Sequence, residues 1–316
     1  MTDISTIINR LKKNKKARKS LLKTDKTNAY RLYEKDIPEY PFIIDIYGKQ
    51  AIVYEKGLRV DEDDHELHQL FDEHKQDIEI ALNEVMGIHQ NDITFKLRSR
   101  QKGKDQYTKN SRTNSFFNIQ ENDMQFKVNL LDYLDSGLFL DHRPLRKILK
   151  DGSKGKSVLN LFSYTGSISV AAALGGALVT TVDMSKTYLE WAIDNFELNN
   201  INIEKHEFIQ ADVIAFLENE LNSKFDTIIL DPPSFSNSKR MDDFFEVQRD
   251  HVRLLELLMP ALKPNGVLYF SNNLRKFKID PEVTEKYQVK DISLKSIPRD
   301  FRDLKIHQCY EIRNNS

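Results

Sequence analysis

Residues 157–166 read Ser-Val-Leu-Asn-Leu-Phe-Ser-Tyr-Thr-Gly, and this stretch decides the fold. Its first six residues form a short apolar run that predicts a buried β-strand, and its glycine allows a tight turn before a predicted helix at 167–174. Strands that alternate with helices in this way pair in parallel through right-handed crossovers. We therefore predict an α/β fold with a doubly wound, Rossmann-like sheet, whose further strands lie at 177–182, 207–210, 225–230 and 266–271 and whose second clear helix spans 185–199.

The part of the chain before this alternation has a different character. Residues 1–125 are rich in charge and short strands, so we predict an N-terminal α+β domain at 1–125 and a second domain at 126–316. The first domain has predicted helices at 7–22 and 64–86, a hairpin formed by 42–47 and 50–54, and strands at 93–98 and 116–119 that flank a loop at 101–110.

Charge is distributed unevenly, although the net charge is only −1. Residues 1–31 hold ten Lys and Arg against two Asp, residues 96–112 hold seven against one, and residues 55–84 hold eleven acids against three bases. Two basic segments of this kind predict a surface that faces nucleic-acid phosphates, so we expect the 1–125 domain to contact RNA. The alternative is a solvated helix face and a charged loop.

Several classes of protein are excluded by composition. The longest weakly polar stretch, 167–182, falls short of the ~20 apolar residues that a membrane span needs. A single cysteine, Cys309, excludes an internal disulfide and a cysteine-based zinc cage. The eight histidines show no ligand spacing along the sequence, so we assign no metal. We expect a cytoplasmic protein.

The residues directly after the strands are the candidates for ligand binding, because ligands of such sheets bind beyond the carboxyl ends of the strands. Phe162 to Gly166 follows the first strand, where the glycine lets backbone approach a ligand. Asp183 follows the second strand and could accept both hydroxyls of a ribose. Asp212 and Val213 follow the third, in reach of an adenine amine. Each acid alone could be a helix cap, but together they predict a nucleoside site.

The nucleoside could belong to a nicotinamide cofactor or to S-adenosylmethionine. A pyrophosphate needs the close backbone approach of a G-x-G-x-x-G loop, whereas 160–166 offers bulky Phe162 and Tyr164 and a single glycine. S-adenosylmethionine has no phosphate, and its sulfonium favours aromatic neighbours. The loop therefore favours S-adenosylmethionine.

Asp231-Pro232-Pro233-Ser234-Phe235 follows the fourth strand and is the most specific signal. Two consecutive prolines make a rigid turn with missing amide donors and exposed carbonyls. Such a loop can hold an acceptor base, and Phe235 could stack on a flipped base. The alternative is a structural turn with Phe235 in the core.

Several longer motifs point to one family: GLFLDHR at 137–143, NLFSYTG at 160–166, TVDMS at 181–185 and DPPSFSNSKRM at 231–241, with YRLY at 30–33, DIPEY at 36–40 and RQKGK at 100–104. With these motifs the chain resembles the guanine-N7 methylating half, the K half, of the bacterial bifunctional 23S ribosomal RNA methyltransferases K/L, here as a stand-alone chain. The resemblance implies a class I methyltransferase sheet, S-adenosylmethionine as cofactor, and methyl transfer to a guanine N7 of 23S rRNA or an assembly precursor. Family members carry a second, fused methyltransferase, so we expect that a separate partner methyltransferase could replace that half.

The resemblance also implies the site residues. Residues 141–144 would fold over the cofactor with Arg143 at its carboxylate, although Asp141 could instead cap a helix. The full candidate set for the cofactor is Arg143, Asn160, Phe162, Tyr164, Thr165, Gly166, Asp183, Met184, Ser185, Asp212 and Val213. The candidate catalytic set is Asp231, Pro232, Pro233, Ser234 and Phe235.

Guanine N7 has a lone pair and no proton, so the implied reaction needs no general base. We therefore interpret His142 and His251 as structural residues. Methylation at cytosine C5 would need a thiolate, and Cys309 lies in a predicted strand at 307–312, where burial would keep a thiol inert. Three alternatives stay open: a cytosine-C5 rRNA methyltransferase, a nicotinamide-dependent oxidoreductase, and a non-catalytic RNA-binding module.

Overall fold

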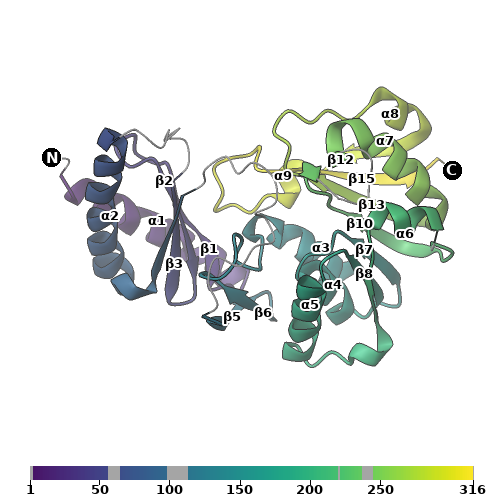
Figure 1. Ribbon diagram of the computed structural model, residues 1–316, viewed down its shortest axis with the longest axis horizontal. Coiled ribbons are helices and arrows are strands. Elements are labelled where there is room, and N and C mark those ends of the chain that lie inside the picture. The colour runs from purple at the N-terminus through teal and green to yellow at the C-terminus, as the bar shows by residue number, and fades with distance from the viewer. Residues whose placement is uncertain (1–2, 56–64, 98–112, 220, 237–244, 316) are drawn as a thin grey trace. The chain divides into compact units, whose positions relative to one another are not determined.

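The structure, a computed structural model, describes residues 3–55, 65–97, 113–219, 221–236 and 245–315. The chain divides into two compact units that interleave along the sequence (Figure 1). Unit 1 comprises 1–123, 128–136 and 299–302, and unit 2 comprises 124–127, 137–298 and 303–316. The division into two domains at residues 125 and 126 stays a prediction. Among the described residues, no helix combines the length and the apolar character needed to cross a membrane.

Unit 1 contains a four-stranded sheet and two long helices. The sheet has the order β1-β2-β3-β4, with β3 and β4 parallel and the other pairs antiparallel. Helices α1 and α2 pack with the sheet around one apolar cluster that includes Ile7, Leu11, Ile44, Ile78 and Leu82. The elements are α1 (Ser5–Thr24), β1 (Ala29–Glu34), β2 (Phe42–Tyr47), β3 (Gln50–Glu55), α2 (His65–Met86), η1 (Gln90–Asp92), β4 (Ile93–Leu97) and β5 (Phe116–Glu121). The next strand, β6 (Met124–Asn129), has residues in both units.

The predicted helices and hairpin of this unit are confirmed, and strand β1 is an addition. Arg31 interrupts the apolar pattern of β1, which is why the pattern gave no strand. The structure buries this arginine: its guanidinium bonds Asp45 at 2.8 Å and Glu34 at 2.8 Å, so the charge is compensated inside the sheet. The predicted loop at 101–110 and the basic stretch from 98 to 112 lie outside the described residues.

Unit 2 is built on a seven-stranded sheet of order β14-β15-β13-β10-β7-β8-β9. The five predicted strands pair in parallel, which confirms the doubly wound α/β fold. The sheet is mixed, however, because β15 runs antiparallel to both β13 and β14. The strands are β7 (Ser157–Leu161), β8 (Leu178–Asp183), β9 (Glu207–Gln210), β10 (Phe225–Leu230), β13 (Leu262–Asn272), β14 (Tyr287–Asp291) and β15 (Gln308–Asn314).

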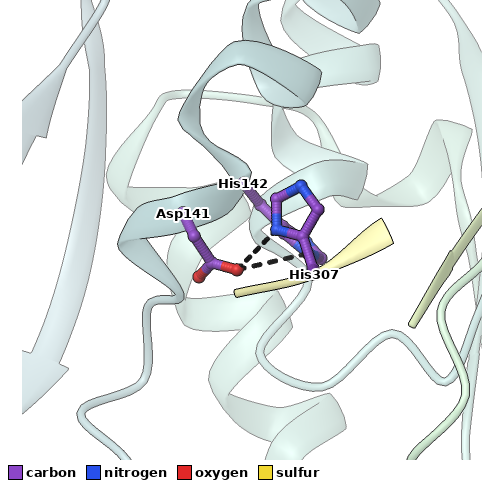
Figure 2. A group of neighbouring side chains, drawn as sticks. All are labelled: Asp141, His142 and His307. Carbon is purple, nitrogen blue, oxygen red and sulfur yellow. Dashed lines mark hydrogen bonds and ion pairs between the residues drawn. The ribbon is translucent and has the colours of Figure 1, made fainter. Parts of the chain in front are cut away.

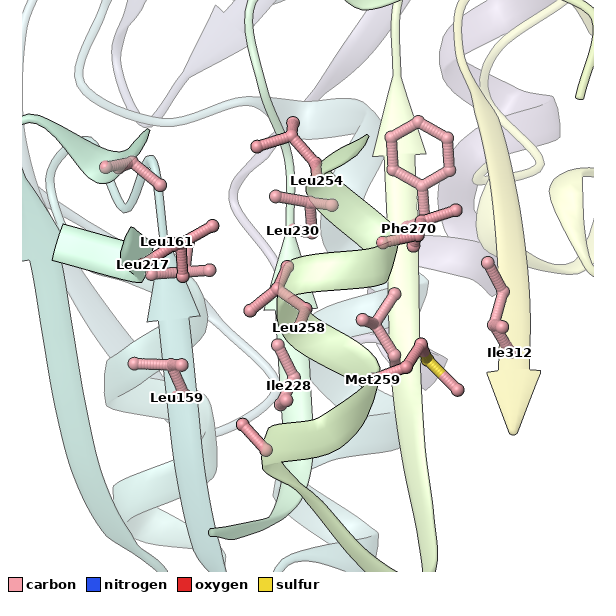
Figure 3. Close-up of a cluster of buried hydrophobic side chains, with 14 of the residues drawn as sticks. Leu159, Leu161, Leu217, Ile228, Leu230, Leu254, Leu258, Met259, Phe270 and Ile312 are labelled. Carbon is pink, nitrogen blue, oxygen red and sulfur yellow. The ribbon is translucent and has the colours of Figure 1, made fainter. Parts of the chain in front are cut away.

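Helices cover both faces of this sheet (Figure 1). Leu254 and Leu258 of α7 lie over β10 and β13 on one face (Figure 3), while Leu145 and Leu149 of α3 pack on the other face. The larger elements are α3 (Arg143–Gly152), α4 (Ser167–Leu174), α5 (Lys186–Leu198), α6 (Val213–Asn219), α7 (Val247–Leu258) and α8 (Pro281–Lys286). The short ones are η3 (Leu140–His142), η4 (Ile203–Lys205), η5 (Met259–Ala261), α9 (Ser293–Ser296), β11 (Phe235–Ser236) and β12 (Phe245–Glu246).

Candidate functional site

The carboxyl ends of five parallel strands lie along one edge of the unit 2 sheet. Near this edge, one residue of each strand pairs with its neighbour across the sheet, in the order Phe270, Leu230, Leu161, Val182 and Ile209. The next residue along each strand therefore lies at the same edge: Ser271, Asp231, Phe162, Asp183 and Gln210. The strands thus bring a hydroxyl, two carboxylates, an aromatic ring and an amide to one edge of the sheet.

The loop after β7 has an unusual backbone. Phe162, Tyr164 and Gly166 have positive φ angles of 52°, 51° and 69°, a conformation that bulky side chains rarely adopt. Such strain persists only where surrounding contacts hold it, and it is common at ligand sites. Here the contacts are specific, because the Tyr164 amide donates to Asp183 Oδ2 at 2.8 Å and Asn195 Nδ2 donates to the Thr165 carbonyl at 2.9 Å.

Gly166 is required for packing as well as for its φ angle. A Cβ at this position would lie 2.6 Å from the Cβ of Ala192 on α5. Gly137 is similar: its φ is +93°, and an added Cβ would lie 2.2 Å from the Trp191 ring. Both glycines therefore let backbone of the site approach α5 closely.

The segment around Gly137 is fixed to the 162–166 loop by two hydrogen bonds. The Gly137 amide donates to the Tyr164 hydroxyl at 3.0 Å, and the Thr165 hydroxyl donates to the Gly137 carbonyl at 2.6 Å. The structure thus brings the start of the GLFLDHR motif next to the 162–166 loop, while the placement of residues 141–144 over the cofactor stays a prediction. Arg143, which begins α3, is buried with 1% exposure.

Asp183 is the most constrained acid of the site. Its two oxygens accept the amides of Tyr164 and Ser185, each at 2.8 Å, and the residue is 8% exposed. Burial raises its pKa to about 6, although the two amide hydrogen bonds work in the opposite direction. The carboxyl group can therefore change its charge near neutral pH.

The other predicted cofactor residues have different surroundings. Asp212 caps α6, since its Oδ1 accepts the amides of Ile214 and Ala215 at 3.1 Å. Asn160 is buried and donates to the Ser169 hydroxyl at 2.9 Å, so its side chain ties the end of β7 to α4. Ser185 caps α5, Met184 is 41% exposed, and Val213 is 3% exposed.

The Asp231–Phe235 loop follows β10 at the same edge. Pro232 is buried, whereas Phe235 is 58% exposed, which is high for so large an apolar side chain. The Ser234 hydroxyl donates to Asn273 Oδ1 at 2.6 Å, and the Ser234 carbonyl accepts the Val247 amide at 3.2 Å. The loop is thus held in place while its aromatic ring remains exposed. The motif residues at 237–241 lie outside the described residues.

Behind Asp231 lies a group of side chains that the sequence pattern did not reveal as a group. Asp141, His142 and His307 each contribute one potential metal-binding atom, and these atoms lie within 4.8 Å of one another (Figure 2). His142 and His307 are 165 positions apart, so no spacing along the chain could have indicated the group. The expectation of no metal stays a prediction. His251 lies apart from this group, and its two ring nitrogens are hydrogen-bonded to backbone of 247–248 and 280.

Comparison with known proteins shows the family of the chain. Residues 90–297 match the model of a family described as S-adenosylmethionine-dependent methyltransferase. The chain is 46% identical to ribosomal RNA large subunit methyltransferase K of Neisseria meningitidis serogroup B, over 100% of this chain and 89% of that protein. It is also 46% identical to methyltransferase K/L of Pseudoalteromonas atlantica, over 98% of this chain but 44% of that protein. The crystal structure of SMU.776 complexed with SAH is similar, with a TM-score of 0.77, 25% identity, and coverage of 99% of this chain and 82% of that one.

Proposed function

The chain belongs to the family of S-adenosylmethionine-dependent methyltransferases, and from this premise we propose that it methylates guanine N7 in the 23S rRNA of the large ribosomal subunit. The predicted family and the predicted cofactor are confirmed by the comparisons. The observation that carries the proposal for the substrate is the near full-length 46% identity to a large-subunit rRNA methyltransferase K.

The residues at the strand edge fit S-adenosylmethionine. Asp183 is a buried acid at the end of β8, where it can accept ribose hydroxyls with the lone pairs that its two backbone amides leave free. Among the described residues, the buried Ser163 hydroxyl has no hydrogen-bond partner, which leaves a polar atom of the loop available. Phe162 and Tyr164 would lie near the sulfonium, Asp212 and Val213 near the adenine, and Arg143 near the carboxylate. When bound, S-adenosylmethionine would supply a methyl group attached to a positively charged sulfur.

The Asp231–Phe235 loop would hold the acceptor base. Exposed Phe235 can stack on a guanine that has been flipped out of its RNA helix, and the rigid proline turn fixes the position of the Phe235 ring. Guanine N7 attacks through an in-plane lone pair, so the protein has to position the base in line and accept the positive charge that develops on it. The Asp231 carboxylate and the loop carbonyls suit that second task.

The cytosine-C5 alternative needs a reactive thiolate, and the single cysteine of the chain is unsuited to this role. Cys309 is 0% exposed in β15, and burial raises the pKa of its thiol to about 12. A group with this pKa holds its proton at neutral pH and is a poor nucleophile. This observation favours the purine over the pyrimidine as acceptor.

The basic face of α1 would contact RNA phosphates. Ile7 and Leu11 bury the opposite side of this helix, and four exposed lysines share the outer side: Lys13, Lys16, Lys19 and Lys23. Since ribosomes are assembled in the cytoplasm, we place the protein there. A separate methyltransferase that replaces the second half of the K/L proteins is a further proposal, and co-purification with a tagged copy of this chain tests it.

Analysis of the methylated nucleoside tests the proposed function. The wild-type protein is incubated with isotope-labelled S-adenosylmethionine and with 23S rRNA from a strain that lacks the homologous enzyme. We expect labelled 7-methylguanosine after digestion, whereas labelled 5-methylcytidine would contradict the proposal. Phe235→Ala should lower kcat/KM for RNA by about 5- to 150-fold, because base stacking on an aromatic ring contributes ~1–3 kcal/mol. Leu178→Ala is the matched control, since Leu178 is 62% exposed at the start of β8, remote along that strand from the site edge.

A further inference from the structure

Two buried histidines lie beside acidic residues of the GLFLDHR motif and of the Asp231 loop. His142 ends η3 and is 6% exposed, and His307 precedes β15 and is 2% exposed. Asp141 Oδ2 lies 2.7 Å from Nδ1 of His307 and 3.9 Å from Nε2 of His142 (Figure 2). The other ring nitrogen of His142, Nδ1, lies 3.6 Å from Asp231 Oδ2. The imidazole of His142 therefore stands between two carboxylates, one of which begins the acceptor loop.

The neighbours of His142 favour one position of the proton on its ring. Ser271 is 1% exposed, and within the described part of the chain its hydroxyl has one hydrogen-bond partner, His142 Nε2 at 3.4 Å. If this hydroxyl donates to Nε2, the proton of a neutral ring lies on Nδ1, which faces Asp231. Nδ1 faces a carboxylate that can only accept, and Asp231 is the nearer of the two carboxylates, at 3.6 Å against 3.9 Å for Asp141 on the Nε2 side, where the Ser271 hydroxyl can supply a proton.

The rest of the group fixes the orientation of the ring. Nδ1 of His307 donates to Asp141, because a carboxylate oxygen has no proton to give. Burial would raise the pKa of Asp141, but the charge that His142 carries in acid and the hydrogen bond from His307 hold it below its ordinary value, so the group is a carboxylate at neutral pH. Burial lowers the pKa of His142, so its ring is neutral near pH 7. A neutral ring can orient Asp231 without cancelling the negative charge of that residue.

We propose that His142 is a positioning residue for methyl transfer, which holds the Asp231 carboxylate through Nδ1–H while Ser271, Asp141 and His307 hold the ring. This inference rests on the proposed role of Asp231. The present 3.6 Å separation is longer than a normal hydrogen bond, and catalytic hydrogen bonds commonly shorten when the substrates are bound. Bound guanine with a developing positive charge would draw the Asp231 carboxylate into its working position.

A metal ion is the competing explanation for the same three residues. The 2.7 Å between Asp141 and His307 is the distance of a direct hydrogen bond, and Nε2 of His307 lies 2.8 Å from the Ser296 hydroxyl. His142 divides its two nitrogens between Ser271 and Asp231. The geometry thus describes hydrogen-bonded side chains, and metal analysis of the purified protein separates the two explanations.

Two conservative variants distinguish positioning from general support of the fold. In His142→Asn the amide nitrogen lies close to the place of Nδ1, so the donor to Asp231 is retained. In His142→Gln the amide reaches the place of Nε2, on the side of Ser271, and the donor to Asp231 is lost. We expect His142→Gln to lower kcat by about 100-fold, the effect of a misplacement of about 1 Å, with KM for both substrates changed less than about threefold. His142→Asn should retain at least about a third of kcat.

A double-mutant cycle with Asp231→Asn shows whether His142 acts through Asp231. If it does, His142→Gln should lower kcat less than about threefold in the Asp231→Asn background. Equal effects in both backgrounds, equal loss in the Asn and Gln variants, or one zinc ion per chain that the His142 variants lose would overturn the inference. The product of the wild-type protein is identified separately. A product other than 7-methylguanosine would refute the proposed function, while the cycle can still be measured on that product.

Discussion

Protonation of Asp183 should weaken cofactor binding in a defined pH range. The pKa of its carboxyl group is about 6 in the unliganded protein, so roughly nine in ten molecules are protonated at pH 5 and one in ten at pH 7. A protonated carboxyl group cannot accept both ribose hydroxyls while it also accepts two backbone amides. We therefore expect the Kd for S-adenosylmethionine to rise about tenfold from pH 7 to pH 5, which corresponds to ~1.4 kcal/mol.

Asp183→Asn removes the titrating group and keeps the shape of the side chain. Because a hydrogen bond to a charged group contributes ~1.5–3 kcal/mol, Kd at pH 7 should rise about 10- to 150-fold, with no further rise at pH 5. Asp226→Asn is the matched control. Asp226 also accepts a backbone amide beside the sheet, at the start of β10, but its pKa is about 2, so it stays ionised over this range.

Isothermal titration calorimetry between pH 5 and 7 measures the Kd values of the three proteins. The α-amino group of the cofactor has an ordinary pKa of ~7.7–8.0, so it stays largely protonated in this range and adds little pH dependence. The pH affects folding stability in the opposite direction to cofactor binding. A raised carboxyl pKa means that the unliganded folded state binds the proton more tightly, so this group lowers stability as the pH rises through 6. A wild-type Kd that changes less than twofold from pH 7 to 5, or an unaltered pH dependence in Asp183→Asn, would refute the assignment.

Three other predictions concern packing, the thiol and the basic helix. Gly137→Ala should lower the free energy of unfolding by ~3 kcal/mol or more, because the added Cβ would overlap Trp191 and the φ of this residue is +93°. Gly155→Ala, which has open space around the added Cβ, should lower it by only ~1 kcal/mol, and a denaturant titration measures both values. Cys309→Ser should fold and retain most methyl transfer to RNA in the nucleoside assay, because a thiol with a pKa of about 12 takes no part in it. Each lost phosphate contact reduces the slope of log RNA affinity against log salt concentration by ~0.7–0.9. We therefore expect this slope, measured by filter binding, to become shallower by about 3 when four lysines are replaced by Gln: Lys13, Lys16, Lys19 and Lys23.

The parallel core of unit 2 could be predicted because its strands are short and buried on both faces. Apolar runs such as 157–161 and 225–230 need no partner information to be identified as strands. Strand β14 lacked this signal. Its five residues, Tyr-Gln-Val-Lys-Asp, lie at the edge of the sheet and are all partly or fully exposed, so the alternation of apolar residues is weak there. The strand at 307–312 was predicted and corresponds to β15, but β14 and the antiparallel pairing of β15 were absent from the prediction.

The residues at the strand ends could be predicted for a related reason. A parallel sheet carries whatever follows each strand to one edge, so the positions of Asp183 and Asp231 followed from the strand assignments alone. Their detailed contacts did not follow. The sequence could not show that Asp183 already accepts two amides, and it left a helix cap open for both acids, which the structure shows at Asp212. These contacts depend on backbone geometry in the turns, where Phe162 and Tyr164 adopt positive φ angles against their usual preference.

The surroundings of His142 show where prediction from the sequence ends. The residue was interpreted as structural because the reaction needs no base, and that argument considered only a direct role in proton transfer. Its actual neighbours come from three separate elements: Ser271 at the end of β13, Asp231 after β10 and His307 before β15. A strand end can be identified locally, but the partners of a buried ring depend on which distant segments pack around it. The loop that receives the base is therefore visible in the sequence, whereas the side chain that orients its carboxylate becomes visible only in the folded chain.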